Sequence, residues 1–90
     1  SNEISDFERG KMFMKLGDYD NAVKSFKLAV WNQPDDAERH YYLGAAFENV
    51  GERKKAYKRF LISAKIGSKD ISEKFSQRAW KWFKEGYSYR

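Results

Sequence analysis

The sequence predicts an all-α fold, in which two antiparallel helix hairpins stack side by side and a fifth helix follows. Three observations support this fold. The chain superimposes on itself after a shift of 34 residues. Apolar residues recur at the spacing of one helix face, and no segment alternates apolar and polar residues for long enough to indicate a strand. With 90 residues, the chain is expected to form one domain over residues 1–90.

The internal repeat keeps small residues and phenylalanines in register together. The shift of 34 pairs Gly10 with Gly44, Phe13 with Phe47, Leu16 with Val50, Gly17 with Gly51, Asp18 with Glu52, Ala22 with Ala56, Lys24 with Lys58 and Phe26 with Phe60. Small residues let two helix axes approach closely, and a phenylalanine fills the space beside them. The repeat therefore predicts two hairpins of the same design, at about residues 3–36 and 37–70.

The first hairpin is predicted to contain helices near residues 3–16 and 19–32. An apolar stripe at helical spacing marks the first of them: Phe7, Gly10, Phe13 and Leu16. Gly17 can adopt the left-handed conformation that ends a helix, and Asp18 can cap the next one. Pro34 ends the second helix because proline disfavours helical backbone in the residue before it.

The second hairpin is predicted to contain helices near residues 36–50 and 53–66. The pair Asp35 and Glu38 has the spacing of a capping box at the start of the first of these helices. Gly51 ends that helix as Gly17 ends its counterpart. Short connections make neighbouring helices antiparallel.

The repeated residues resemble the tetratricopeptide repeat. From Gly17 to Pro34 the chain is similar to the second half of that repeat, which has a glycine, two aromatic residues, two alanines and a proline at fixed spacings. This sequence has Gly17, the aromatic residues Tyr19 and Phe26, the alanines Ala22 and Ala29, and Pro34 at those positions. Leu43, Gly44 and Phe47 resemble its first half. The resemblance covers about residues 3–86 and implies a right-handed superhelical stack.

A fifth helix is predicted near residues 71–85, where Asp70 and Glu73 repeat the capping-box spacing. At a shift of 35, Gly44 falls on Ala79, Phe47 on Trp82 and Gly51 on Gly86. Residues 71–86 thus resemble the first helix of a third repeat, which either caps the stack or begins a longer array. A polar outer face is expected from Lys74, Arg78, Lys81 and Lys84.

The resemblance also implies a concave groove lined by the first helix of each hairpin, in which a peptide or protein segment binds. The register places these groove residues at Ile4, Phe7, Lys11, Met14, Lys15, Glu38, Tyr41, Ala45, Glu48, Asn49, Ser76, Trp80, Phe83 and Lys84. The alternative for the aromatic rings among them is that they fill the core between helices. A clamp for an acidic carboxyl terminus, known in the family, is not expected, because Tyr41, Tyr42 and Ala45 stand where an asparagine would be needed.

The charge is unevenly distributed along the chain. Residues 1–50 carry a net charge of −3 and residues 51–90 a net charge of +8. A basic half can attract nucleic acid or another acidic polymer, although a lysine-rich helix face often serves solubility alone. Nucleic acid is the alternative partner to protein, and homotypic end-to-end stacking of copies is a third possibility.

Catalysis is not expected. His40 is the one histidine, there are no cysteines, and the acidic pairs at residues 18, 20, 35 and 36 stand where helix capping explains them. No cofactor, metal site, membrane span or amino-terminal leader is expected. The absence of cysteine is compatible with a reducing compartment, so the cytoplasm is the expected location. The sequence thus favours a protein-interaction scaffold or adaptor.

Overall fold

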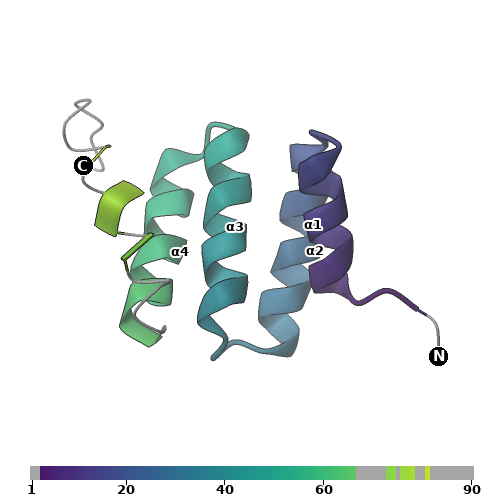
Figure 1. Ribbon diagram of the computed structural model, residues 1–90, viewed down its shortest axis with the longest axis horizontal. Helices are drawn as coiled ribbons and strands as arrows, with labels where there is room; N and C mark the ends of the chain where they lie inside the picture. The colour runs from purple at the N-terminus through teal and green to yellow at the C-terminus, as the bar shows by residue number, and fades with distance from the viewer. Residues whose placement is uncertain (1–2, 67–72, 75, 79–80, 82–90) are drawn as a thin grey trace.

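The computed structural model describes residues 3–66, 73–74, 76–78 and 81, and within them it is helical with no strand. Four helices stand side by side in Figure 1: α1 (Asp6–Lys15), α2 (Tyr19–Asn32), α3 (Ala37–Asn49) and α4 (Arg53–Ile66). The described residues between 73 and 81 are also helical and belong to the predicted fifth helix. The predicted all-α stack of hairpins is therefore confirmed.

Polar side chains fix where the first three helices begin. Ser5 accepts a hydrogen bond from the backbone of Glu8 (3.1 Å), so α1 begins at Asp6, three residues later than predicted. Asp18 caps α2, as predicted. The cap of α3 is Asp36 rather than the predicted Asp35, because the Asp36 carboxylate accepts from two backbone amides of the first turn.

Gly17 and Gly51 end α1 and α3 in the same way. Their φ angles are +75° and +84°, in the left-handed region where glycine carries no steric penalty. The amide after each glycine donates to a carbonyl five residues back, from Asp18 to Phe13 and from Glu52 to Phe47, both at 2.9 Å. These bonds define Schellman motifs, so the predicted helix ends are confirmed and the two hairpins turn alike.

Replacing Gly51 by alanine is expected to lower the free energy of unfolding by about 1–2 kcal/mol, because an L side chain is strained in the left-handed region. No neighbouring atom lies within 4 Å of the added Cβ, so backbone strain alone causes the loss. Thermal unfolding followed by circular dichroism measures it. The Gly51→Asn variant is the control and should lose less, since asparagine tolerates this conformation. An alanine variant that melts above the wild type would contradict the assignment.

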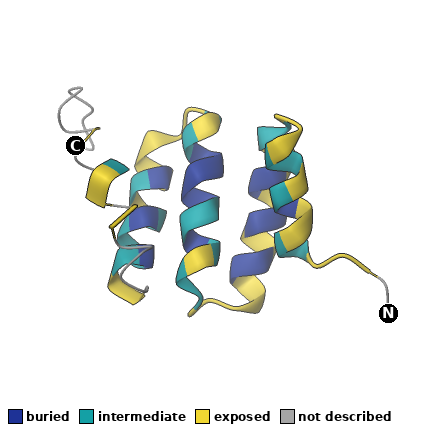
Figure 2. Cartoon of the chain, in the orientation of Figure 1, coloured by how far each residue is buried: buried dark blue, intermediate teal, exposed yellow. Residues whose placement is uncertain are grey.

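The core forms where glycines of one helix meet phenylalanines of the next. Phe26 on α2 and Phe60 on α4 are fully buried. A Cβ built on Gly10 would lie 2.5 Å from the Phe26 ring, and one on Gly44 would lie 2.7 Å from the Phe60 ring. Each glycine therefore makes room for one ring, as the repeat predicted. Figure 2 shows buried residues along α2, α3 and α4, with exposed residues at the loops and outer surfaces.

The two hairpins join through α2 and α3. Tyr42 on α3 packs its ring against Phe7 and Phe26, with centroid distances of 5.3 and 5.6 Å. Arg39 donates to the Ala29 carbonyl near the end of α2 (2.8 Å) and lies over the Phe7 ring. These contacts hold the first helix of each hairpin on the same side of the stack.

Candidate protein-binding groove

The α1 part of the predicted groove is mostly packed surface. Phe7 is half-buried, and its ring contacts Phe26 at a centroid distance of 5.8 Å. Lys11 covers the same ring, with its ammonium 4.7 Å from the centroid. Met14 is half-buried against the core, whereas Lys15 is exposed. Phe7 thus helps to join the hairpins, and its contact with a partner stays a prediction.

The α3 part of the predicted groove divides into buried and accessible residues. Ala45 is only 8% exposed and belongs to the core cluster, so it offers a partner almost no surface and is corrected to a core residue. Asn49 is exposed and donates to the Ala45 carbonyl (2.8 Å). Tyr41 and Glu48 are half-buried, and they lie on the same face because seven residues make about two helical turns.

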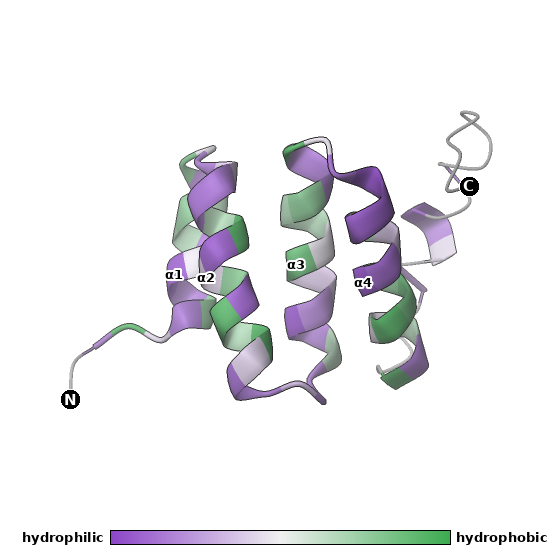
Figure 3. Ribbon diagram, turned by 180° about the vertical axis from the view of Figure 1, so that it is seen from behind, coloured by the Kyte–Doolittle hydropathy of each residue, from purple (hydrophilic) through white to green (hydrophobic). Residues whose placement is uncertain are grey.

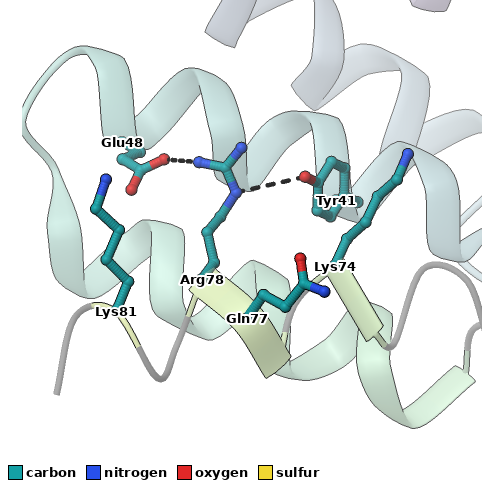
Figure 4. Close-up of a pocket in the computed structure, with 6 residues that line it drawn as sticks. All are labelled: Tyr41, Glu48, Lys74, Gln77, Arg78 and Lys81. Atoms are coloured by element: carbon teal, nitrogen blue, oxygen red, sulfur yellow. Dashed lines mark hydrogen bonds and ion pairs between the residues drawn. The ribbon is translucent and has the colours of Figure 1, made fainter. Parts of the chain in front are cut away.

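Tyr41 and Glu48 line a polar pocket together with the fifth helix. This groove pocket has a volume of about 290 Å³ and is lined by Tyr41, Glu48, Lys74, Gln77, Arg78 and Lys81. Figure 4 shows the side chains of both elements converging on it. The structure therefore brings two predicted groove residues of α3 next to four residues that the groove prediction did not include.

Arg78 is the central side chain of the groove pocket. Its guanidinium donates to the Tyr41 hydroxyl (3.4 Å) and forms an ion pair with Glu48. It also lies over the Phe60 ring, 5.4 Å from the centroid. Burial disfavours its charge, but the Tyr41 hydrogen bond and the Glu48 carboxylate outweigh burial and raise the pKa of Arg78 above its usual value. Arg78 is therefore cationic at any physiological pH.

The fifth helix docks on α3 much as α3 docks on α1. Tyr41 is the repeat equivalent of Phe7, and the Tyr41–Phe60 ring contact (5.3 Å) repeats the Phe7–Phe26 contact. Lys74 lies over Tyr41 with its ammonium 5.9 Å from the centroid, as Arg39 lies over Phe7. The described part of the fifth helix thus occupies the place of a third repeat's first helix.

Two predictions for the fifth helix need correction. Arg78 does not contribute to an outer face, since it points towards α3 and contacts Tyr41 and Glu48. Lys74 and Lys81 are exposed but line the groove pocket. The groove side of this helix thus includes positions 74, 77, 78 and 81, at helical spacing, rather than the predicted Ser76. The predicted groove residues Trp80, Phe83 and Lys84, and also Asp70, lie outside the described residues.

His40 is a structural residue, as predicted. It is 4% exposed, and its Nε2–H donates to the Pro34 carbonyl at 2.8 Å. Its Nδ1 then accepts from the Arg59 guanidinium at 3.4 Å. Among the described residues no group of His, Asp or Glu side chains is arranged to hold a metal ion.

Comparison with known proteins gives one match. Residues 10–51 match a family model described as TPR repeat, the tetratricopeptide repeat. The search of curated proteins returned no match, and neither did the search of solved structures. Repeats of this family generally serve as non-catalytic scaffolds for protein–protein interaction. In the described part of the chain, no helix has the length and hydropathy needed to cross a membrane.

Proposed function

We propose that the chain is a protein-binding module of the tetratricopeptide repeat kind, because residues 10–51 match that family's model. Its ligand is a peptide or protein segment that lies in the groove formed by α1, α3 and the fifth helix. The observation that carries the proposal is the groove pocket, in which predicted groove residues of α3 meet side chains of the fifth helix. Stacked helical hairpins use such concave surfaces for binding.

The groove pocket favours polar recognition. Three cations and one carboxylate line it, together with a glutamine amide and the Tyr41 ring. Arg78 is already held by Tyr41 and Glu48, so it is ordered before a ligand arrives, and ordering in advance reduces the entropic cost of binding. Lys74 and Lys81 are exposed on either side and can contact a bound segment. No catalytic role is proposed.

The groove proposal predicts that exchanging Lys74 and Lys81 for glutamate weakens peptide binding by about tenfold or more, since truncated or reversed hot-spot contacts cost over 1 kcal/mol. Peptides are first selected from a random display library on the full chain, and their affinities for wild type and variant are then compared by isothermal titration calorimetry. These two exposed lysines are chosen over Tyr41 because the Tyr41 ring packs on Phe60, so its removal would also affect folding.

Arg9→Glu combined with Lys24→Glu serves as the control, because both residues are exposed, on α1 and α2, and neither lines the groove pocket. The control leaves groove peptides unaffected and changes the total charge equally. The proposal is wrong if every selected peptide binds the Lys74 and Lys81 variant as tightly as the wild type.

A further inference from the structure

The side of the stack formed by α2 and α4 exposes an unusual aromatic residue. Trp31, near the end of α2, is 83% exposed, the largest value among the exposed large apolar side chains of the described residues. Leu28, three residues earlier and so on a neighbouring part of the helix surface, is 53% exposed. Adjacent exposed apolar side chains of this size mark interaction sites more often than single ones do.

Trp31 borders a pocket that is separate from the groove pocket. This Trp31 pocket has a volume of about 520 Å³ and is lined by Lys27, Val30, Trp31, Pro34, Leu43 and Arg59. Its walls come from α2, α3, α4 and the loop after α2, and it shares no lining residue with the groove pocket. Figure 3, drawn from behind, shows hydrophobic segments on α2 and α3 at this side, and a hydrophilic first half of α4.

Hydrogen bonds hold part of the pocket wall in place. Arg59 is within 3.4 Å of the His40 ring, and His40 in turn is bonded to the Pro34 carbonyl. Leu43, which contributes to the floor, is fully buried. Three of the lining residues are therefore fixed by the core and by the His40 network, which gives a ligand a preformed site.

The charged residues in the lining of the Trp31 pocket are all basic, while acidic residues lie beyond it: Asp35 and Asp36 follow Pro34, and Glu52 pairs with Lys55. Lys27 and Arg59 are part of its lining, and none of the six lining residues is acidic. Lys55 lies close by, since its ammonium and that of Lys27 are 5.8 and 5.7 Å from the Phe47 ring centroid. Helix α4, which forms one wall, carries six basic residues and no acidic one: Arg53, Lys54, Lys55, Lys58, Arg59 and Lys65.

We propose that the Trp31 pocket docks a second protein segment, one with a large apolar side chain flanked by aspartate or glutamate. The apolar side chain enters the pocket beside Trp31 and Val30, and the acidic residues face Lys27 and the basic surface of α4. Apolar burial supplies affinity, and complementary charge supplies orientation and speed of association. Nucleic acid fits less well, because four of the six lining residues are apolar and phosphates need a continuous track of cations.

The test selects peptides from a random library on the 90-residue chain carrying Lys74→Glu and Lys81→Glu, in which groove binding is impaired. Selected peptides are expected to carry an apolar residue flanked by acids. Titrated into the ¹⁵N-labelled variant, they should shift the Trp31 indole resonance. Adding Trp31→Ala should weaken their binding by about tenfold or more, and Lys27→Glu by several-fold, with the loss from charge reversal smaller at high salt.

Leu16→Ala is the matched control, because Leu16 is 77% exposed on another helix and does not line the pocket. It should leave the selected peptides' affinity unchanged. The inference is overturned by selected peptides without an acidic excess, by unchanged binding to the Trp31→Ala variant, or by tighter binding of a single-stranded DNA oligonucleotide to this face. Self-association that Trp31→Ala abolishes, seen by sedimentation, would also overturn it, because the occupant would then be a second copy. None of these outcomes bears on the groove, because the groove test uses peptides selected on the chain with Lys74 and Lys81 intact and measures how their affinity changes when these two lysines are replaced.

Discussion

Replacing Phe60 by alanine is expected to lower the free energy of unfolding by about 3–5 kcal/mol, the usual loss when a buried phenylalanine is truncated. Phe60 is fully buried, its ring contacts Tyr41, and Arg78 lies over it. The alanine variant therefore leaves a cavity between α3 and α4 and removes a surface on which the fifth helix rests. A domain of this size has a total stability on the order of 5–13 kcal/mol, so the variant is close to unfolding.

Urea denaturation followed by circular dichroism measures this loss as a lower midpoint. Trp31→Ala is the matched control, since it removes an aromatic ring that is almost entirely in solvent and should change stability by about 0.5 kcal/mol or less. If the two variants lost equal amounts of unfolding free energy, Phe60 would not be the core residue that its burial indicates.

Replacing Gly44 by alanine is expected to destabilise the fold by about 1–3 kcal/mol, although alanine favours a helix over glycine by about 1 kcal/mol. The added Cβ would lie 2.7 and 2.8 Å from two atoms of the Phe60 ring. Because that ring is fully buried, it cannot move aside without disturbing α4. Steric overlap therefore outweighs the gain in helix propensity.

A double-mutant cycle separates the two effects. In the background of Phe60→Ala the overlap is gone, so Gly44→Ala should become neutral or stabilising there, with a coupling of about 1–3 kcal/mol. Gly10→Ala should behave like Gly44→Ala, since its Cβ would lie 2.5 Å from Phe26. If Gly44→Ala raised the melting temperature in the wild-type background, the close approach of the helices would be refuted.

The helix ends were largely predictable because they depend on neighbouring residues. Gly17 and Gly51 take positive φ where the repeat placed helix ends, and Asp18 caps α2. Two predictions were wrong: the cap of α3 by one residue and the first residue of α1 by three. Asp35 and Asp36 are both competent caps, and the backbone conformation of Asp36 decided between them. Ser5 likewise begins α1 later than the apolar stripe indicated.

The candidate site was only partly predictable. Register placed Tyr41 and Glu48 correctly on one accessible face, because both follow from helical periodicity. It could not place Arg78 on the Phe60 ring, since a charged residue is normally expected at the surface. The helical spacing of Lys74, Arg78 and Lys81 was visible in the sequence, and it marked one face without showing whether that face met α3 or solvent.

The sequence alone determined the fold class, the two hairpins and the pairing of Gly10 with Phe26 and of Gly44 with Phe60, because these depend on local conformation and on a periodic pattern. Only the tertiary structure decided which aromatic and charged side chains are covered. Ala45 is buried and Arg78 packs against α3, although both were expected at accessible positions, while Trp31 is almost fully exposed. The reason is that exposure depends on which neighbouring helix packs against a face, and amphipathic periodicity identifies the face but not its neighbour.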